Sequence, residues 1–171
     1  MVKNILVTGG IKSGKSSYAL ELADKYKGEK IFLATARAFD DEMAQKIERH
    51  KAERDDSYKT IEEPIKIGKI ISEVSFTLLV IDCITIWLSN LFFETEPEQR
   101  NIYVNEFLES IKNFNGEIII VTNEVGSGII PENKISREYQ SELGKLNQEI
   151  AKLCDEIYLL VSGVAVKIKE Q

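Results

Sequence analysis

The sequence predicts an α/β protein of the P-loop NTPase type, with a mostly parallel sheet and helices on both of its faces. Short apolar strands alternate with helical segments along the 171 residues, and this alternation is typical of a parallel sheet that is covered on both sides. The first apolar run leads directly into Gly9-Gly10-Ile11-Lys12-Ser13-Gly14-Lys15-Ser16. This stretch fits the phosphate-binding pattern G-x-x-x-x-G-K-[ST].

The elements follow one another with little interruption. Short runs rich in Ile, Leu and Val predict strands at residues 5–7, 30–35, 58–61, 77–82, 117–122, 157–161 and 164–169. Apolar residues at helical spacing predict helices at residues 16–26, 40–54, 64–71, 84–94, 98–113 and 135–154. Because no repeat, linker or low-complexity segment interrupts the pattern, we expect residues 1–171 to form a single nucleotide-binding domain.

The amino-acid composition and charge limit the classes of protein to which this chain can belong. Hydrophobic residues make up 43% and charged residues 29%, which is ordinary for a soluble globular protein. The net charge is −6 and there is no basic stripe, so nucleic acid is not the expected partner. The longest apolar stretch, 76–93, contains Asp82, Ser89 and Asn90, so no membrane span is expected. No signal peptide is apparent, and we expect a cytoplasmic protein.

The two cysteines, Cys83 and Cys154, lack the spacing of metal ligands. We expect both to be reduced, buried and structural.

The glycine-rich stretch has the chemistry of a phosphate cradle. Glycines let the backbone curl so that several N–H groups point into one hollow, and the following helix adds the positive end of its dipole. Lys15 would then reach the β and γ phosphates, while the Ser16 hydroxyl would ligate Mg2+. The alternative is an ordinary glycine-rich turn, but the strand before it and the helix after it favour nucleotide binding.

Other polar residues are expected at the same edge of the sheet, because ligands gather at the carboxyl ends of parallel strands. Thr35 follows the second strand, and residues 123–132 form a constrained loop with two glycines and a proline after a later strand. This loop is either a substrate contact or a plain connection. Asp82 ends an apolar strand, as the magnesium-orienting acid of a P-loop enzyme does. The alternative is that Asp82 caps the next helix.

His50 is the only histidine of the chain and lies in a highly charged predicted helix. A lone histidine on a polar helix is usually a solvated residue. However, Arg49, Lys51 and Arg54 form a cationic cluster that could hold phosphates and keep the imidazole neutral, and the neutral form is the nucleophile. The residues alone leave both interpretations open.

A set of sequence blocks spreads over almost the whole chain: 5–10, 13–16, 34–36, 40–43, 47–51, 60–64, 82–85, 87–91, 121–126, 128–133, 146–148 and 161–163. In this order they resemble the bifunctional adenosylcobinamide kinase / adenosylcobinamide-phosphate guanylyltransferase family of cobalamin assembly. The phosphate loop alone is generic. The block at His50-Lys51, the block 123–132 and the Val161-Ser162-Gly163 end are specific.

The resemblance implies two reactions. A kinase step moves the γ phosphate of ATP or GTP onto a hydroxyl of adenosylcobinamide, and a transferase step moves GMP from GTP onto that new phosphate. His50 matches the histidine that the family guanylylates. Lys15 would act in catalysis, and Ser16 and Asp82 would bind Mg2+. The implied nucleotide contacts are Gly9, Gly10, Ile11, Lys12, Ser13, Gly14, Lys15, Ser16, Thr35, Ala36, Arg37, Lys51, Ala52, Glu53, Arg54, Glu62 and Asp82.

The resemblance also implies a homotrimer, to which the apolar segment 84–93 could contribute, although that segment could equally be core. We further hypothesise that Glu62 accepts hydrogen bonds from the guanine base. The sequence departs from the family where Arg49 replaces a second histidine and where Asp55-Asp56 and Tyr58 precede the Thr60-Ile61-Glu62 block.

Two rival functions remain at this level. One is a P-loop small-molecule kinase without guanylyltransferase activity, in which His50 is incidental. The other is a GTP switch, which usually carries an Asn-Lys-x-Asp motif. Here Asn133-Lys134 is followed by Ile135-Ser136, so that motif is absent.

Overall fold

The computed structural model describes residues 3–37, 57–74 and 77–170. The strands are β1 Asn4–Gly9, β2 Lys30–Ala34, β3 Tyr58–Glu62, β4 Leu78–Asp82, β5 Glu117–Val121, β6 Glu156–Val161 and β7 Val164–Glu170. The helices are α1 Lys15–Ala23, α3 Ile67–Glu73, α4 Ile84–Glu94, α5 Pro97–Asn113 and α6 Lys134–Leu153. The predicted strands are all present, and the last one is β7.

The strands form one seven-stranded sheet in the order β3-β2-β4-β5-β1-β6-β7. Every neighbouring pair is parallel except β6 and β7, which are antiparallel. The inner parallel strands β1, β2, β4 and β5 are short and mostly buried, as expected for strands that are covered on both sides. The prediction of a mostly parallel sheet is therefore confirmed.

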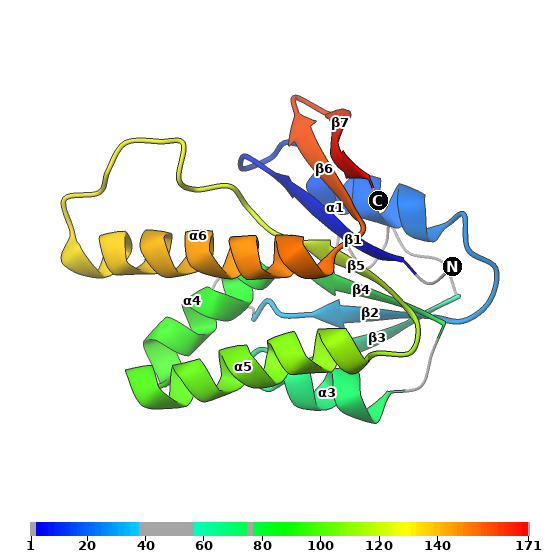
Figure 1. Cartoon of the computed structure of the whole chain (residues 1–171), viewed down its shortest axis with the longest axis horizontal. Helices are drawn as coiled ribbons and strands as arrows, with labels where there is room; N and C mark the ends of the chain where they lie inside the picture. The colour runs from blue at the N-terminus through cyan, green and yellow to red at the C-terminus, as the bar shows by residue number, and fades with distance from the viewer. Residues whose placement is uncertain (1–2, 38–56, 75–76, 171) are drawn as a thin grey trace.

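Each face of the sheet has its own apolar core, because successive side chains of a strand point to opposite faces. Ile5, Val7 and Val80 pack against α1, while Leu6 and Ile81 pack into the core shared with α3, α4, α5 and α6. Figure 1 shows α1 on one side of the sheet and these four helices on the other. Helices therefore cover both faces, as predicted.

Helix α4 is the most deeply buried helix of the larger core. Ile84, Trp87, Leu88 and Leu91 are almost fully buried, and the Trp87 ring lies 4.9 Å from the ring of Phe107 on α5. Most of the predicted apolar segment 84–93 is thus core. Phe93 is the exception, since 85% of its surface is exposed.

Helix α3 begins at Ile67 rather than at Pro64, where the sequence predicted it. The carboxylate of Glu63 accepts hydrogen bonds from the backbone N–H groups of Ile65 and Lys66, both at 2.8 Å. The indole N–H of Trp87 donates to the Ile65 carbonyl at 2.7 Å. These contacts hold the backbone in a turn before the helix can start.

Helix α1 ends at Ala23, three residues before the predicted end at Tyr26. Asp24 follows, and its carboxylate accepts hydrogen bonds from Lys30 Nζ at 3.2 Å and from the Tyr58 hydroxyl at 2.7 Å. Gly28 has a φ of 117°, which only glycine adopts readily, so the chain turns there towards β2.

At the amino end of β6, a buried carboxylate joins three partners. Glu156 accepts hydrogen bonds from Lys3 Nζ and from the Tyr158 hydroxyl, and its other ion pair is with Lys167 at 3.4 Å. The hydrogen bond from Lys3 is the main cause that lowers the pKa of Glu156 from 4.5 to about 2. The carboxylate is therefore charged at any pH near neutrality.

Both cysteines are buried, as the sequence predicted, and they are not joined in a disulfide. Burial raises the pKa of the Cys154 thiol to about 12. Within the described ranges, no helix is both long and apolar enough to cross a membrane.

Candidate nucleotide-binding site

Most of the predicted site residues that the structure describes gather at the carboxyl edge of the sheet. Ala34 of β2 lies opposite both Glu62 of β3 and Asp82 of β4, and Asp82 lies opposite Val121 of β5. These strands therefore end at the same level. The segments that follow them share one edge with the phosphate loop that follows β1, in agreement with the prediction.

The phosphate loop has the backbone that its glycines permit. Gly9 has a φ of 147° and Gly14 a φ of 94°, and a Cβ atom at Gly9 would lie 2.4 Å from the carbonyl oxygen of Leu160. Lys12 also adopts a positive φ, of 54°. Glycine is required at position 9 on two grounds, since a side chain there would be strained and would also collide with β6.

Lys15 lies inside the hollow of this loop. Its residue is only 7% exposed, and its Nζ atom donates to the Gly10 carbonyl and approaches Ser13 Oγ at 3.4 Å. Lys15 is the first residue of α1, whose N-cap is Gly14 and has no side-chain cap. The N–H groups of the first helical turn and the ammonium group both favour an anion at this place.

The turn between β6 and β7 supports the phosphate loop, a role that the sequence analysis missed. Ser162 and Gly163 have φ values of 51° and 84°, as the favoured two-residue hairpin requires. The Gly163 N–H donates to the Ser13 carbonyl at 3.0 Å, and a Cβ at Gly14 would lie 3.4 Å from the Gly163 Cα. The only signal in the sequence was the Val161-Ser162-Gly163 block.

Thr35 is fully buried and bonds within the protein. Its Oγ1 donates to the Cys83 carbonyl and accepts from the Cys83 N–H, both at 2.8 Å. Its backbone N–H donates to the Asp82 carbonyl at 3.2 Å. Thr35 therefore joins the end of β2 to the end of β4, and a nucleotide contact of Thr35 stays a prediction.

Asp82 is half-buried at the end of β4. It does not cap α4, because the N-cap is Cys83 and no side chain makes a cap hydrogen bond there. The capping alternative for Asp82 is therefore not observed. With the hydroxyl of half-buried Ser16, its carboxylate offers the hard oxygen donors that Mg2+ prefers, so these residues fit the ion.

Two further predicted contacts lie on the surface of this edge. Glu62 ends β3 with an exposed side chain. Arg37 is exposed and forms an ion pair with Glu94, with 2.9 Å between Nη1 and Oε1. Ala36 lies between Thr35 and Arg37 and is half-buried.

The segment after β5 is tied to the phosphate loop and to two helices. The Glu124 N–H donates to the Gly9 carbonyl at 3.0 Å. The Asn123 N–H donates to Thr85 Oγ1 of α4 at 2.7 Å, and Asn147 of α6 donates to the Asn123 carbonyl at 3.1 Å. Its start is therefore fixed, whereas the part that leads to α6 extends away from the sheet (Figure 1) and carries the exposed side chain of Ile129.

Comparison with known proteins decides the family. The sequence profile of the cobinamide kinase / cobinamide phosphate guanyltransferase family matches residues 5–168. The chain belongs to this family. The earlier resemblance is thereby confirmed, and this family member is a transferase with the α/β fold that the sequence predicted.

Curated relatives agree with the family profile over nearly their full length. A bifunctional adenosylcobalamin biosynthesis protein from Pseudomonas aeruginosa, CobP, is 36% identical over 167 residues, which cover 96% of each chain. Its counterpart from Salmonella typhimurium, CobU, is 35% identical over 180 residues, which cover 96% of this chain and 99% of the relative.

Solved structures agree on the fold alone. An ATPase of a bacterial type III secretion system aligns with a TM-score of 0.56 at 12% identity, over 93% of this chain and 51% of the other. A Pyrococcus horikoshii protein, PH0250, aligns with a TM-score of 0.55 at 8% identity, over 98% of this chain and 86% of the other.

Some predicted site residues of this family member lie outside the described residues. They are His50, Lys51, Ala52, Glu53 and Arg54, together with the rest of the predicted helix 40–54. Their predicted roles stay predictions.

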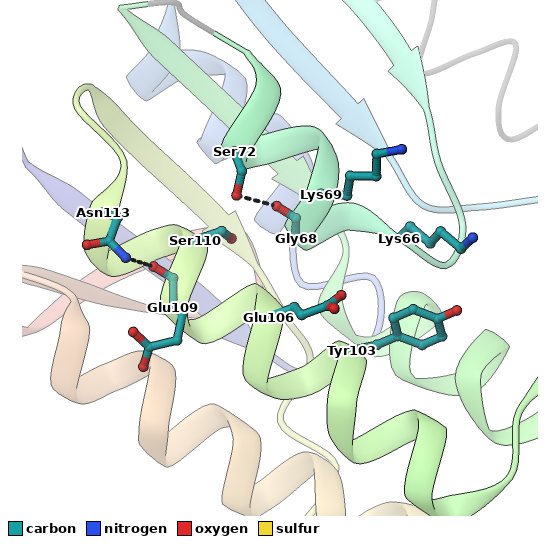
Figure 2. A pocket seen from close by; sticks show the side chains of 9 residues that line it. All are labelled: Lys66, Gly68, Lys69, Ser72, Tyr103, Glu106, Glu109, Ser110 and Asn113. Carbon is teal, nitrogen blue, oxygen red and sulfur yellow. Dashed lines mark hydrogen bonds between the residues drawn. The ribbon is translucent and has the colours of Figure 1, made fainter.

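A pocket of about 600 Å³ lies between α3 and α5, and its lining includes Lys66, Lys69, Glu106 and Glu109 (Figure 2). None of its lining residues belongs to the predicted site. Lys69 and Glu109 form ion pairs within their own helices, at 3.7 Å with Glu73 and with Lys112. This pocket is a solvated groove between two helices rather than part of the nucleotide site.

Proposed function

We propose that this chain phosphorylates adenosylcobinamide and then transfers GMP from GTP to the new phosphate. The observation that carries the proposal is the buried Lys15 in a strained phosphate loop, in a chain that matches the kinase and guanyltransferase family from residue 5 to residue 168. The products would be adenosyl-GDP-cobinamide and pyrophosphate.

In the kinase step, the hydroxyl oxygen of adenosylcobinamide forms a bond to the γ phosphorus of ATP or GTP, and the bond from that phosphorus to the bridging oxygen breaks. ADP or GDP leaves, and the hydroxyl proton passes to water. The loop N–H groups and Lys15 stabilise the charge on the moving phosphoryl group. The geometry supports this role, because the Lys15 ammonium already lies inside the loop. Positioning is the main requirement of phosphoryl transfer.

In the guanylyl step, a neutral nitrogen of His50 attacks the α phosphorus of GTP, and pyrophosphate leaves as the bond to the bridging oxygen breaks. A phosphate oxygen of the acceptor then attacks the same phosphorus, and the bond from phosphorus to nitrogen breaks. His50 is the sole histidine, and Arg49, Lys51 and Arg54 beside it in the sequence would hold phosphates. Together these steps return the enzyme unchanged.

Ser16 and Asp82 are the residues that would hold Mg2+ in this proposal. When bound, the ion neutralises charge on the phosphates and on the leaving group. The chain's own contribution is to supply one hydroxyl and one carboxylate at the carboxyl edge of the sheet.

Glu62 is proposed to select guanine. A carboxylate can accept the N1–H and the exocyclic amino group of guanine together, whereas adenine offers no such pair of donors on that edge. The position of Glu62 supports the assignment, because it ends β3 at the carboxyl edge of the sheet, opposite Ala34 of β2. We also propose a cytoplasmic homotrimer as the working form of the enzyme.

Labelling with GTP that is radioactive at the α phosphate tests the proposal. The protein is incubated with Mg2+ and labelled GTP, then denatured and washed with alkali or acid. We expect label that survives alkali, is lost in acid and is absent from a His50→Ala variant. A folded protein that binds GTP yet retains no label would contradict the histidine mechanism and leave the simple kinase.

A further inference from the structure

Asn90 of α4 joins the segment after β2, which carries the predicted nucleotide contacts 35–37, to the segment after β3, the strand that ends in Glu62. Its residue is 3% exposed. Its amide Nδ2 donates to the Thr35 carbonyl at 2.9 Å and to the Pro64 carbonyl at 3.1 Å. The first carbonyl belongs to the segment that follows β2 and the second to the segment that follows β3. One side chain therefore bridges both segments through their main chains.

Only a side chain that donates hydrogen bonds can make this bridge. Carbonyl oxygens only accept hydrogen bonds, and a primary amide carries two N–H groups, one for each carbonyl. The Asn90 side chain is buried, so a carbonyl that lost its partner there would stay unpaired in the interior, which is unfavourable. Aliphatic side chains of similar size could fill the space but could not hold the two carbonyls together.

Neighbouring contacts fix the rest of each segment. Thr35 is bonded through its hydroxyl to Cys83. Trp87, which lies one turn before Asn90 on the same face of α4, donates to the Ile65 carbonyl at 2.7 Å. The Glu63 N–H donates to the Ala34 carbonyl at 3.0 Å. Asn90 adds a direct link to these contacts, because its side chain donates hydrogen bonds to both segments.

We infer that Asn90 is a positioning residue for base recognition. It sets the separation between the backbone of residues 35–37 and the carboxylate of Glu62, although it is not proposed to touch the nucleotide. The inference rests on the proposed function, in which Glu62 selects guanine, and on the predicted nucleotide contacts of residues 35–37. The phosphate loop lies after β1 and is held by other contacts, so phosphate binding should not depend on Asn90.

Comparing the binding of GTP with the binding of inorganic tripolyphosphate distinguishes base recognition from phosphate binding. Calorimetric titration of the full-length chain with each ligand and Mg2+ compares the wild type, Asn90→Ala and Ile111→Val. Ile111 is buried in the same core on α5, so Ile111→Val controls for a general loss of stability. We expect Asn90→Ala to weaken GTP binding about tenfold and to leave tripolyphosphate binding unchanged, while Ile111→Val changes neither.

The outcomes are distinct. If Asn90→Ala keeps the wild-type affinity for both ligands, the inference is wrong and Asn90 is only structural. If Asn90→Ala weakens both ligands equally, Asn90 acts on the whole fold and the inference is also wrong. A wild type that does not bind GTP would instead overturn the proposed function. Should Asn90→Ala fail to fold, Asn90→Ser replaces it, since a hydroxyl can still donate to one carbonyl and a partial loss of GTP affinity is expected.

Discussion

At the scale of single residues, the phosphate loop shows how strictly a backbone can determine an amino acid. Gly9 and Gly10 are adjacent, yet their surroundings differ. A Cβ at Gly9 would collide with the Leu160 carbonyl of β6, whereas a Cβ at Gly10 would have no atom within 4 Å. The pattern G-x-x-x-x-G-K-[ST] reflects this difference, because its first fixed glycine is Gly9.

Gly9→Ala is expected to abolish GTP binding and to lower stability by about 1–3 kcal/mol. The added methyl group must displace β6 or the loop itself, and either shift moves the phosphate cradle. Gly10→Ala is the matched control for stability, and it should keep the wild-type Tm. Thermal denaturation of the two variants and GTP titration of Gly9→Ala check the prediction, and an equal Tm of the pair would contradict it.

The buried carboxylate of Glu156 predicts a pH dependence of stability. Its pKa is lowered from 4.5 to about 2, chiefly by the hydrogen bond from Lys3. A lowered folded-state pKa means that the charged carboxylate stabilises the fold above about pH 4.5, and that this contribution is lost as the pH falls towards 2. Glu156→Gln should therefore lower Tm at neutral pH, and the difference from wild type should shrink through this acid range.

Thermal denaturation at a series of pH values measures that difference. Glu149→Gln is a suitable control, since the ion pair of Glu149 with Lys152 is exposed on α6 and surface pairs of this kind contribute little. A Glu156→Gln difference that stayed constant down to pH 2 would show that the carboxylate is not responsible.

At the scale of elements, α4 organises the carboxyl edge of the sheet. Thr85 accepts from the segment after β5, Trp87 donates to the turn before α3, and Asn90 bridges the segments after β2 and β3. A helix that packs in the core thus positions three loop segments, those after β2, β3 and β5, by hydrogen bonds. Substitutions that alter the packing of α4 should therefore change nucleotide binding, although no residue of α4 is proposed to contact the nucleotide.

Helix α3 packs against α5 at a very short distance, which Gly68 makes possible. A Cβ at Gly68 would lie 2.7 Å from the Phe107 backbone nitrogen and 2.8 Å from the Glu106 backbone carbon. We expect Gly68→Ala to destabilise the protein by about 1–3 kcal/mol, because backbone atoms cannot move aside as a side chain can.

Gly144→Ala is a control that should raise stability, whereas Gly68→Ala should lower it. Gly144 lies within α6, and a Cβ there would have no atom within 4 Å. Alanine should therefore stabilise the helix by about 0.5–1 kcal/mol. Chemical denaturation of both variants measures the two changes, and a neutral Gly68→Ala would show that the two helices can separate freely.

At the scale of the whole molecule, features that depend on a few neighbouring residues could be predicted from the sequence. Contacts between segments far apart in the chain could not. The phosphate loop and the apolar strands were predictable, because a glycine pattern and short apolar runs carry the signal within a few residues. The bridge from Asn90 to Pro64, the bond from Gly163 to Ser13 and the delayed start of α3 were not. Each of these depends on partners that only the folded sheet brings together.

Alkylation of the buried Cys154 thiol measures unfolding of the whole molecule. The thiol is buried between α6 and the sheet, and burial raises its pKa to about 12. Because the thiolate is the reactive form, we expect no alkylation of Cys154 at pH 8 in the native protein and complete alkylation in denaturant. Site-resolved mass spectrometry measures the modification, and rapid native labelling would show that α6 opens locally.

The order of the strands has a consequence for synthesis of the chain. β1 leads into the phosphate loop and leaves the ribosome before the other strands of the sheet, but its neighbours are β5 and β6, which are made much later. Until then β1 has both edges unpaired, and parallel pairing over such long separations forms slowly. Nascent chains that end before β5 should therefore need protection from aggregation, and the nucleotide site can assemble only when the last third of the polypeptide has emerged.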